Sequence, residues 1–302
     1  MRFVSYRCLD VDSYGLLLDG GDILDLPAAA GLAREKLPAA GMLAFIAEGA
    51  PALAAARRLS AAARERRLAP AIRAAGTAHL TAPIPRPLKN VFCVGRNYRD
   101  HVAEGARAMG TEASLPKYPQ FFTKPPTAVN GPGQAFHHDP SITQRLDYEV
   151  ELAVIMGRTG RNIAPADALD HVFGFTIVND ITARDLQRRH EQWFKGKGLD
   201  GSCPMGPAIV ERSDITDLPG LELTLTVDGE QRQCAHVRDM IFDIPTIISS
   251  LSLGMTLEAG DIIATGTPAG VGFAMNPPRY LSAGNVVVCR ISGLGELVTP
   301  ID

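Results

Sequence analysis

Apolar and polar residues alternate over the first 26 residues of the chain, in segments such as FVSYRCL and YGLLLDGGDILDL. Alternation with a period of two is typical of β-strands, because successive side chains point to opposite faces. The sequence Asp19-Gly20-Gly21 between two such segments is typical of a hairpin turn. We therefore predict short strands at the start of the chain.

From residue 28 to residue 75 the pattern changes, and the chain is rich in Ala, Leu and Arg with prolines between the runs. This composition predicts two or three short helices. The segment TAPIPRPLKN follows, with three prolines in five residues, which neither a helix nor a central strand accommodates. We expect a small N-terminal α/β domain over residues 1–80, a proline-rich linker over 81–87 and a main domain over 88–302.

The main domain contains mostly strand patterns, among them NVFCVG, YEVELAVIMG, VFGFTIVND, LELTLTVDGE and NVVVCRISGLGELV. The best helical patterns are NYRDHVAEGARAMG, ITARDLQRRHEQWF and IPTIISSLS. Because strands and helices do not alternate regularly, a doubly wound parallel sheet is disfavoured. The sequence predicts an α+β fold with a mixed, mainly antiparallel sheet and peripheral helices.

Composition excludes several classes of function. The chain has 302 residues, of which 46% are apolar and 21% charged, and a net charge of −3, so we expect no nucleic-acid partner. No apolar run reaches the roughly 18 residues of a membrane-spanning helix. The N-terminus lacks a signal-peptide pattern, and the five cysteines are dispersed, which favours a cytoplasmic protein without a zinc cage or disulfide framework.

The segment DYEVELAVIMG carries the most informative polar residues. In a strand, Glu149 and Glu151 point to one face while Val150 and Leu152 point to the other. Taken alone, such a pair is more often a solvated strand face than a metal site. However, the next strand pattern ends in Asp180, and three carboxylates on two neighbouring strands form an oxygen cage suited to Mg²⁺, Mn²⁺ or Ca²⁺.

Six segments occur in the order typical of one known family, namely VGRNYRDHVAE, PQFFTKPPTAVNGPG, DYEVELAVIMGRTGRNI, GFTIVNDITARDLQ, GKGLDGSCPMGP and GDIIATGTPAGVG. Over residues 88–302 the chain resembles the fumarylacetoacetate hydrolase family. The resemblance implies a β-sandwich or roll, and a Mg²⁺ or Mn²⁺ ion held by Glu149, Glu151 and Asp180. It also implies a homodimer formed by the main domain.

His101 and Glu104 are three residues apart in a predicted helix and therefore lie on one face, where the carboxylate would orient the imidazole. A surface pair is the alternative. The resemblance implies that the two form a dyad on a lid and activate water. Lys197 lies in the segment FKGKGLDG, which is expected to form a glycine-flanked loop, and there it is expected to stabilise an oxyanion. The nearby Lys195 is an alternative with a similar position in the sequence. The Gly-Lys motif of the family corresponds to Lys197 and implies that Lys197 is the functional lysine.

Three further residues are predicted to bind substrate. Arg184 and Gln187 follow Asp180 by one and two turns of a helix expected to begin beside the metal, and Thr267 lies in the turn GDIIATGTPAGVG. The amides of the glycines in this turn, Gly266, Gly270 and Gly272, are candidates for binding an anion, although a tight structural turn is the alternative.

Other motifs are absent or uninformative. The glycine-rich turn lacks the Lys-Ser/Thr ending of a nucleotide-binding loop, and no Gly-x-Ser-x-Gly elbow of a serine hydrolase occurs. His137 and His138, next to Pro140, are expected to lie in an ordinary loop.

This site predicts a metal-dependent hydrolase that cleaves the carbon–carbon bond of an acylpyruvate or a related 1,3-dicarbonyl acid, in a bacterial aromatic-catabolic or sugar-acid pathway. The same scaffold also serves oxaloacetate-type decarboxylases and hydroxymuconate-type isomerases. A non-catalytic carboxylate-binding protein is the alternative of a different class. It would need the metal but no base, so the His101 and Glu104 pair favours an enzyme.

Overall fold

Most strands of the protein join one large mixed sheet in the computed structural model, which describes residues 1–65 and 67–302. In sheet order its strands are β4 (Ile72–Arg73), β3 (Ile23–Asp25), β2 (Val11–Leu17), β1 (Arg2–Cys8), β14 (Cys203–Glu211), β12 (Val172–Asn179), β10 (Val150–Met156), β18 (Ile262–Ala264), β6 (Val91–Gly95) and β7 (Gln120–Lys124). β5 (His79–Thr81) pairs with β1, and β8 (Val129–Asn130) with β14. Within the described ranges, β18–β6 and β14–β8 are the parallel pairs of named strands, and the rest are antiparallel. The predicted mixed, mainly antiparallel α+β fold is confirmed.

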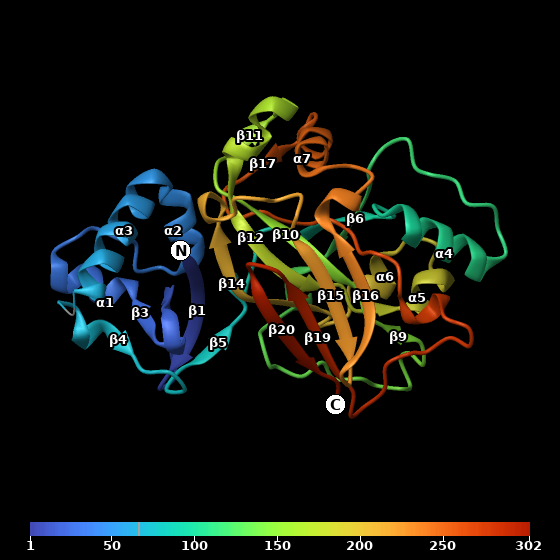
Figure 1. Ribbon diagram of the computed structural model, residues 1–302, viewed down its shortest axis with the longest axis horizontal. Coiled ribbons are helices and arrows are strands. Elements are labelled where there is room, and N and C mark those ends of the chain that lie inside the picture. Colours follow the sequence, from blue (N-terminus) through green and yellow to red (C-terminus); the bar gives the residue numbers. More distant parts are fainter. Residues whose placement is uncertain (66) are drawn as a thin grey trace.

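A second, antiparallel sheet of four strands packs on the large one (Figure 1). Its strands are β16 (Glu230–His236), β15 (Glu222–Val227), β19 (Val286–Ile291) and β20 (Gly295–Pro300). Val150, Leu152 and Val154 point into the core between the sheets, together with Leu223 and Leu225. Since side chains alternate along β10, the two glutamates of this segment belong to the opposite face, as predicted.

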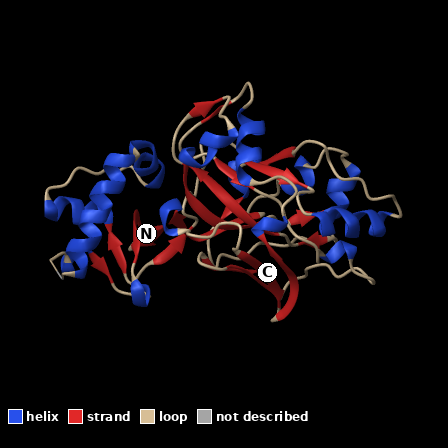
Figure 2. Ribbon diagram, turned by 45° about the horizontal axis from the view of Figure 1, so that its top comes forward, coloured by secondary structure: helices blue, strands red, loops and turns tan. Residues whose placement is uncertain are grey.

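Short elements complete the fold. Two small strand pairs are β9 (Leu146–Asp147) with β13 (Thr182–Ala183), and β11 (Gly160–Arg161) with β17 (Thr256–Leu257). The helices are α1 (Leu26–Ala33), α2 (Met42–Glu48), α3 (Ala50–Arg64), α4 (Arg99–Met109), α5 (Arg184–Arg189), α6 (Phe194–Lys197) and α7 (Ile244–Ser252). They lie around the sheets rather than between them (Figure 2). None of the helices described is long and apolar enough to cross a membrane.

The N-terminal region extends the large sheet, because β1 pairs with β14. Its helices α1, α2 and α3 lie in the region where two or three helices were predicted. Arg66, in the same region, lies outside the described residues. Phe3 and Phe45 pack against Phe173 of β12, with ring centroids 5.2 and 6.2 Å from it. The first 80 residues and the rest of the chain therefore share a core, seen where the blue lobe meets the sheet in Figure 1. The division into domains at residues 80 and 88 stays a prediction.

One helix prediction is wrong in its extent. The pattern ITARDLQRRHEQWF suggested a single helix beside Asp180, but α5 begins only at Arg184 and ends at Arg189. Thr182 and Ala183 before it pair with β9. Glu191 after it has a φ of 58°, in the left-handed region, which ends the helical run before α6.

Candidate active site

The predicted metal ligands meet where β10 and β12 lie side by side. Val150 is opposite Asn179 in the register of this pair, so Glu149 is opposite Asp180. The backbone N–H of Asp180 donates to the carbonyl oxygen of Glu149 at 2.8 Å. One carboxylate oxygen each from Glu149, Glu151 and Asp180 lies within 4.8 Å of the other two. The structure therefore brings the three residues together.

These carboxylates are buried, so the alternative of a solvated strand face is wrong. Glu149 is 4% exposed, Glu151 1% and Asp180 0%. The Lys197 ammonium lies 2.8 Å from Glu149 Oε2 and 2.7 Å from Asp180 Oδ2. The Lys124 ammonium, also buried, donates to Asp180 Oδ1 at 2.6 Å. Positive side chains thus compensate much of the acidic charge.

The two glutamates differ sharply in how far neighbouring positive charges compensate their negative charge. Burial alone would raise the pKa of Glu149, but the positive charges of Lys197 and Arg184 outweigh it and lower that pKa to about 2. Burial and the like charges of Asp180 and Glu149 raise the pKa of Glu151 well above its usual range. The backbone N–H of Gly266 donates to the Glu151 carboxylate at 2.9 Å. Within residues 1–65 and 67–302, Glu151 therefore has no cation at ion-pair distance, and only the more distant charge of Lys197 favours its ionised form.

The site as a whole fits a divalent cation. Among the described residues, the buried charged groups in the acidic cluster itself are the carboxylates of Asp147, Glu149, Glu151 and Asp180 and the cations of Lys124, Arg184 and Lys197, while Glu104 lies beyond them, bonded to His101. With all seven of these groups ionised, one negative charge would be in excess, at Glu151, and the cost of burying that charge without a partner raises the pKa of its carboxyl group. The donors are carboxylate oxygens, the ligands preferred by Mg²⁺, Mn²⁺ and Ca²⁺.

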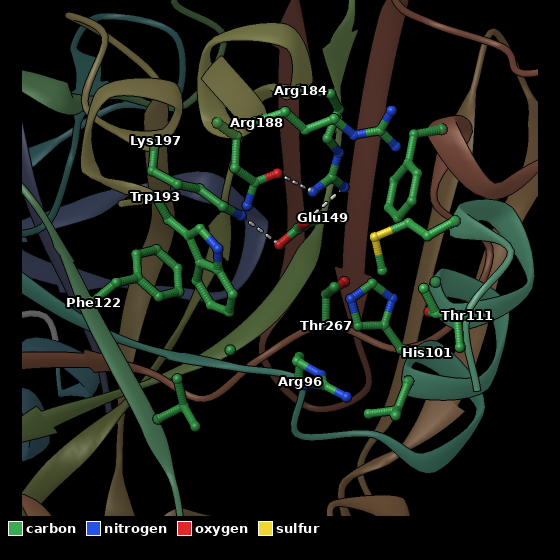
Figure 3. A pocket seen from close by; sticks show the side chains of 18 of the residues that line it. Arg96, His101, Thr111, Phe122, Glu149, Arg184, Arg188, Trp193, Lys197 and Thr267 are labelled. Atoms are coloured by element: carbon green, nitrogen blue, oxygen red, sulfur yellow. Dashed lines mark hydrogen bonds and ion pairs between the residues drawn. The ribbon is translucent and has the colours of Figure 1, made fainter. Parts of the chain in front are cut away.

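His101 and Glu104 form the predicted pair on α4. His101 Nδ1 lies 2.9 Å from Glu104 Oε1, and the two side chains are 13% and 11% exposed. The other carboxylate oxygen, Glu104 Oε2, accepts the backbone N–H of Gly270 at 2.8 Å. The imidazole faces the cavity in Figure 3. Glu104 thus ties the imidazole to the turn that follows β18, and the pair is not a surface helical pair.

The glycine-rich turn binds carboxylates of the protein itself. Besides the bonds of Gly266 and Gly270 to Glu151 and Glu104, the N–H of Gly272 donates to Asp147 Oδ1 at 2.8 Å. The expectation that these amides bind a substrate anion is therefore wrong for this structure, because each amide already has an acceptor. The turn instead holds the acidic residues in place.

Thr267, in the same turn, lines the cavity. Its Oγ1 accepts the Gln233 side-chain N–H at 2.8 Å. The hydroxyl hydrogen has no acceptor in the part of the chain that the structure describes, so it is free to donate to a bound molecule. Thr267 therefore remains a candidate for substrate binding.

Arg184 and Gln187 both line the cavity, from α5. Arg184 is largely committed within the protein, since its Nε donates to Asp147 Oδ2 at 2.8 Å and its Nη2 lies 2.7 Å from Glu149 Oε1. Its Nη1 donates to Gln187 Oε1 at 3.3 Å, and the Phe273 ring lies against the guanidinium. In this arrangement Arg184 organises the acidic cluster. Its expected role in binding the substrate stays a prediction.

Lys197 ends the short helix α6 rather than lying in a loop, which corrects the sequence prediction. Lys195, its competitor, is exposed, whereas the Lys197 ammonium is buried among the carboxylates. Its expected role at a substrate oxyanion stays a prediction.

A cavity of about 470 Å³ opens over these groups (Figure 3). Seven of the nine predicted site residues line it, namely His101, Glu149, Glu151, Arg184, Gln187, Lys197 and Thr267. Glu104 and Asp180 lie behind them, bonded to His101 and Lys197 respectively.

Comparison with known proteins agrees with this arrangement. A model of the family described as "Fumarylacetoacetate (FAA) hydrolase C-terminal" matches residues 90–302. The chain is 45% identical over 305 residues to the oxaloacetate tautomerase YisK of Bacillus subtilis (strain 168), with 100% of both chains covered. The chain belongs to the fumarylacetoacetate hydrolase family.

Two solved structures of this family resemble the chain over its length. The fumarylacetoacetate hydrolase of the psychrophilic Exiguobacterium antarcticum has a TM-score of 0.81 at 37% identity, covering 100% of this chain and 99% of that one. The maleylpyruvate hydrolase of Sphingobium sp. SYK-6, in complex with manganese(II) and pyruvate, has a TM-score of 0.76 at 29% identity, covering 100% and 98%. The family resemblance inferred from the six motifs is confirmed.

Several residues of the site in this family member were not identified from the sequence. Lys124 ends the strand pattern QFFTK, and a lysine at a buried strand end was an available signal. Asp147 continues the alternation of Glu149 and Glu151 towards the N-terminus, which was a second signal. Nothing in the sequence pointed to Trp193. Its ring packs so closely on the backbone of Gly95 that a Cβ atom at Gly95 would lie 2.1 Å from the ring.

His137 and His138 lie apart from the acidic cluster, as predicted. His138 Nε2 lies 3.0 Å from the carbonyl oxygen of Thr143, and His137 is an exposed loop residue. Neither joins a cluster of potential metal ligands among residues 1–65 and 67–302.

Proposed function

We propose that this protein is a divalent-cation-dependent tautomerase that interconverts the keto and enol forms of oxaloacetate. The main support is the 45% identity, over the full length of both chains, to an oxaloacetate tautomerase. The site agrees with this chemistry, because tautomerisation needs a base that moves a proton from carbon and polar groups that stabilise the enolate oxygen.

The chain's own residues suit both tasks. Glu149, Glu151 and Asp180 would hold Mg²⁺ or Mn²⁺, with Ca²⁺ as a substitute, and the ion would supply a Lewis acid beside the 2-oxo group. His101 is the proposed base: its imidazole takes a proton from the C3 carbon to give the enolate, and the imidazolium then gives a proton to the enolate oxygen to complete the enol. The reverse reaction runs the same two transfers backwards. Glu104 accepts the Nδ1 hydrogen of the imidazole, which leaves Nε2 free as the proton acceptor.

Two other groups act on the oxygens of the substrate in this proposal. Thr267 donates its free hydroxyl hydrogen to a substrate oxygen. Lys197 is buried at the acidic cluster, where its positive charge favours the enolate over the neutral ketone. Phe122 and Trp193 line the cavity beside these groups, and their rings limit the access of water to the reacting carbon.

Acylpyruvate hydrolysis is the second candidate, favoured by the similarity to a maleylpyruvate hydrolase that binds manganese and pyruvate. Hydrolysis needs the same ion and base, but the base must activate a water molecule that attacks the distal carbonyl. Decarboxylation of oxaloacetate would pass through the enolate of pyruvate and isomerisation of hydroxymuconates through a dienolate, and the same groups would stabilise either one. A non-catalytic carboxylate-binding protein is disfavoured, because it has no use for an imidazole oriented by Glu104.

The test compares oxaloacetate tautomerisation, followed by the ultraviolet absorbance of the enol, with cleavage of acetopyruvate under saturating Mg²⁺. We expect tautomerisation to be the faster reaction and His101→Ala to slow it by about 10² to 10⁴, the range for loss of a general base. Arg107→Ala, at an exposed position of the same helix, is the control. Faster cleavage of acetopyruvate would favour the hydrolase, and full activity of His101→Ala would refute the assigned base.

We also propose that the protein is a homodimer, as the family resemblance implied. Exposed apolar side chains around β7, the last strand of the large sheet, support this proposal, among them Tyr118, Phe121 and Phe194. Light scattering at micromolar concentration tests it, and the mass of a single chain would refute it.

A further inference from the structure

Among the residues that the structure describes, three arginines line the cavity, and they differ in their partners. Arg184 is paired with Asp147 and Glu149. Arg188 is exposed and lies over the Phe273 ring. Arg96 is half-buried, and no carboxylate lies within ion-pair distance of it in the described parts of the chain. Its Nη2 donates to the carbonyl oxygen of Ser114 at 2.6 Å, which occupies one of five N–H groups.

The backbone of Arg96 has an unusual conformation. Its φ is 57°, in the left-handed region, which costs a residue other than glycine about 1 kcal/mol or more. The next residue holds the chain in this course, because the Asn97 side chain donates to the carbonyls of Phe242 and Thr265 at 3.0 and 2.8 Å. Such strain is often kept where it directs a side chain into a functional site.

Arg96 lies on the side of the cavity away from the buried cations. In Figure 3 its guanidinium is beside His101 and Thr267, whereas Lys197 and Arg184 lie across the cavity. A 2-oxo acid held at the acidic cluster would extend its far end away from those carboxylates, which repel a second negative charge. The free guanidinium offers a planar pair of N–H donors, the geometry that matches a carboxylate.

From this geometry we propose that Arg96 binds the distal carboxylate of a dicarboxylic 2-oxo acid and thereby selects such substrates over monocarboxylic ones. This inference rests on the proposed function, because it assumes that the 2-oxo acid end lies at the acidic cluster. Glu112 and Glu191 also line the cavity, but both are exposed and neither pairs with Arg96. They leave the guanidinium available to substrate.

The alternative is that Arg96 only anchors the segment around Ser114. Two substrates separate these roles, since oxaloacetate and 2-oxobutyrate share the 2-oxo acid end and the C3 protons, and differ by a carboxylate in place of a methyl group. Exchange of the C3 protons with deuterium, followed by NMR under saturating Mg²⁺, measures enolisation of both. The variants are Arg96→Met and Arg96→Lys, and Arg99→Met, an exposed arginine outside the cavity, is the control.

We expect Arg96→Met to raise KM for oxaloacetate about 10- to 100-fold, the range for hydrogen bonds to a charged group, and to leave exchange of 2-oxobutyrate unchanged. Arg96→Lys should raise KM less than Arg96→Met does, because lysine keeps the positive charge but lacks the planar pair of N–H donors. Equal losses on both substrates would assign Arg96 to anchoring and overturn the proposal. No change on either substrate would overturn it as well.

A binding experiment separates this inference from the proposed function. Malate and 2-hydroxybutyrate differ by the same carboxylate and cannot enolise at a 2-oxo group, so calorimetry measures their binding to the Mg²⁺-loaded protein. Tighter binding of malate to the wild type, lost in Arg96→Met, supports the distal-carboxylate site even if the wild type does not tautomerise oxaloacetate. Equal affinities of malate for the wild type and Arg96→Met refute the site, whatever the wild type does with oxaloacetate.

Discussion

The two walls of the cavity hold their charged groups in different ways. The sheet wall consists of Glu149, Glu151 and Asp180 with the cations Lys124 and Lys197, where acids and bases are buried together and share partners. The helix wall consists of His101 and Glu104 on α4 with Arg96 before it. Its groups are partly exposed and are held by a few hydrogen bonds.

This difference predicts separate consequences for substitutions. Removing a cation from the sheet wall leaves buried carboxylates with one fewer positive partner, so folding stability should fall. Removing a group from the helix wall leaves a partner that water can reach, so activity should fall while the fold persists. The lesson is that one cavity combines charges that support the fold with charges that are free to act on a substrate.

The largest effect is expected for Lys124→Met in the sheet wall. Asp180 would lose one of its two fully buried ion pairs, that to Lys124 at 2.6 Å, while the pair to Lys197 remains, and breaking a buried pair costs up to about 3–5 kcal/mol of the free energy of unfolding. Urea unfolding of the metal-free protein measures this loss.

The matched control for Lys124→Met is Arg7→Met, because Arg7 pairs with Asp12 on the surface, with both side chains more than half exposed. Exposed pairs contribute about 0–1 kcal/mol, so this variant should unfold almost as the wild type does. A similar loss in both variants would contradict the role of burial in the sheet wall.

Glu151→Gln is expected to separate metal binding from folding within the sheet wall. The amide keeps the shape of the carboxyl group, whose raised pKa already favours the neutral form in the metal-free protein, so the free energy of unfolding should change little. Affinity for Mg²⁺ or Mn²⁺ should fall by more than about 100-fold, since a ligand should matter more than the outer residues whose loss costs 10- to 100-fold. Calorimetric titration measures the affinity, and wild-type affinity in this variant would exclude Glu151 as a ligand.

Glu104→Gln tests the helix wall. Glu104 is bonded to both His101 and the amide of Gly270, and an amide replaces its charge-assisted bonds by weaker ones. We expect kcat to fall about 10-fold or more, which corresponds to about 1.4 kcal/mol, with unchanged metal affinity and stability. A drop in the urea midpoint instead would place Glu104 among the groups that support the fold.

The smallest effect is expected for Thr267→Val, which lies between the two walls. The substitution removes the hydroxyl that accepts from Gln233 and has a hydrogen to donate. Loss of one neutral hydrogen bond to substrate costs about 1 kcal/mol, so KM should rise about 5-fold with kcat nearly unchanged. Steady-state kinetics would exclude a contact with substrate if KM stayed the same.

The sequence by itself determined the local geometry of both walls. The two-residue repeat of a strand places Glu149 and Glu151 on the face opposite Val150, and the three-residue spacing places His101 beside Glu104 in a helix. These relations follow from backbone periodicity over a few residues. The family motifs added the metal and the class of chemistry, which periodicity does not specify.

Only the tertiary structure decided which distant residues meet and which charges are compensated. Lys124 contacts Asp180 across 56 residues of sequence, and Gly270 contacts Glu104 across 166. The start of α5 at Arg184 depends on the pairing of β13 with β9, which the helical pattern does not reveal. Burial and partner choice arise when strands and turns that are far apart in the chain pack together, and no pattern within one segment encodes that packing.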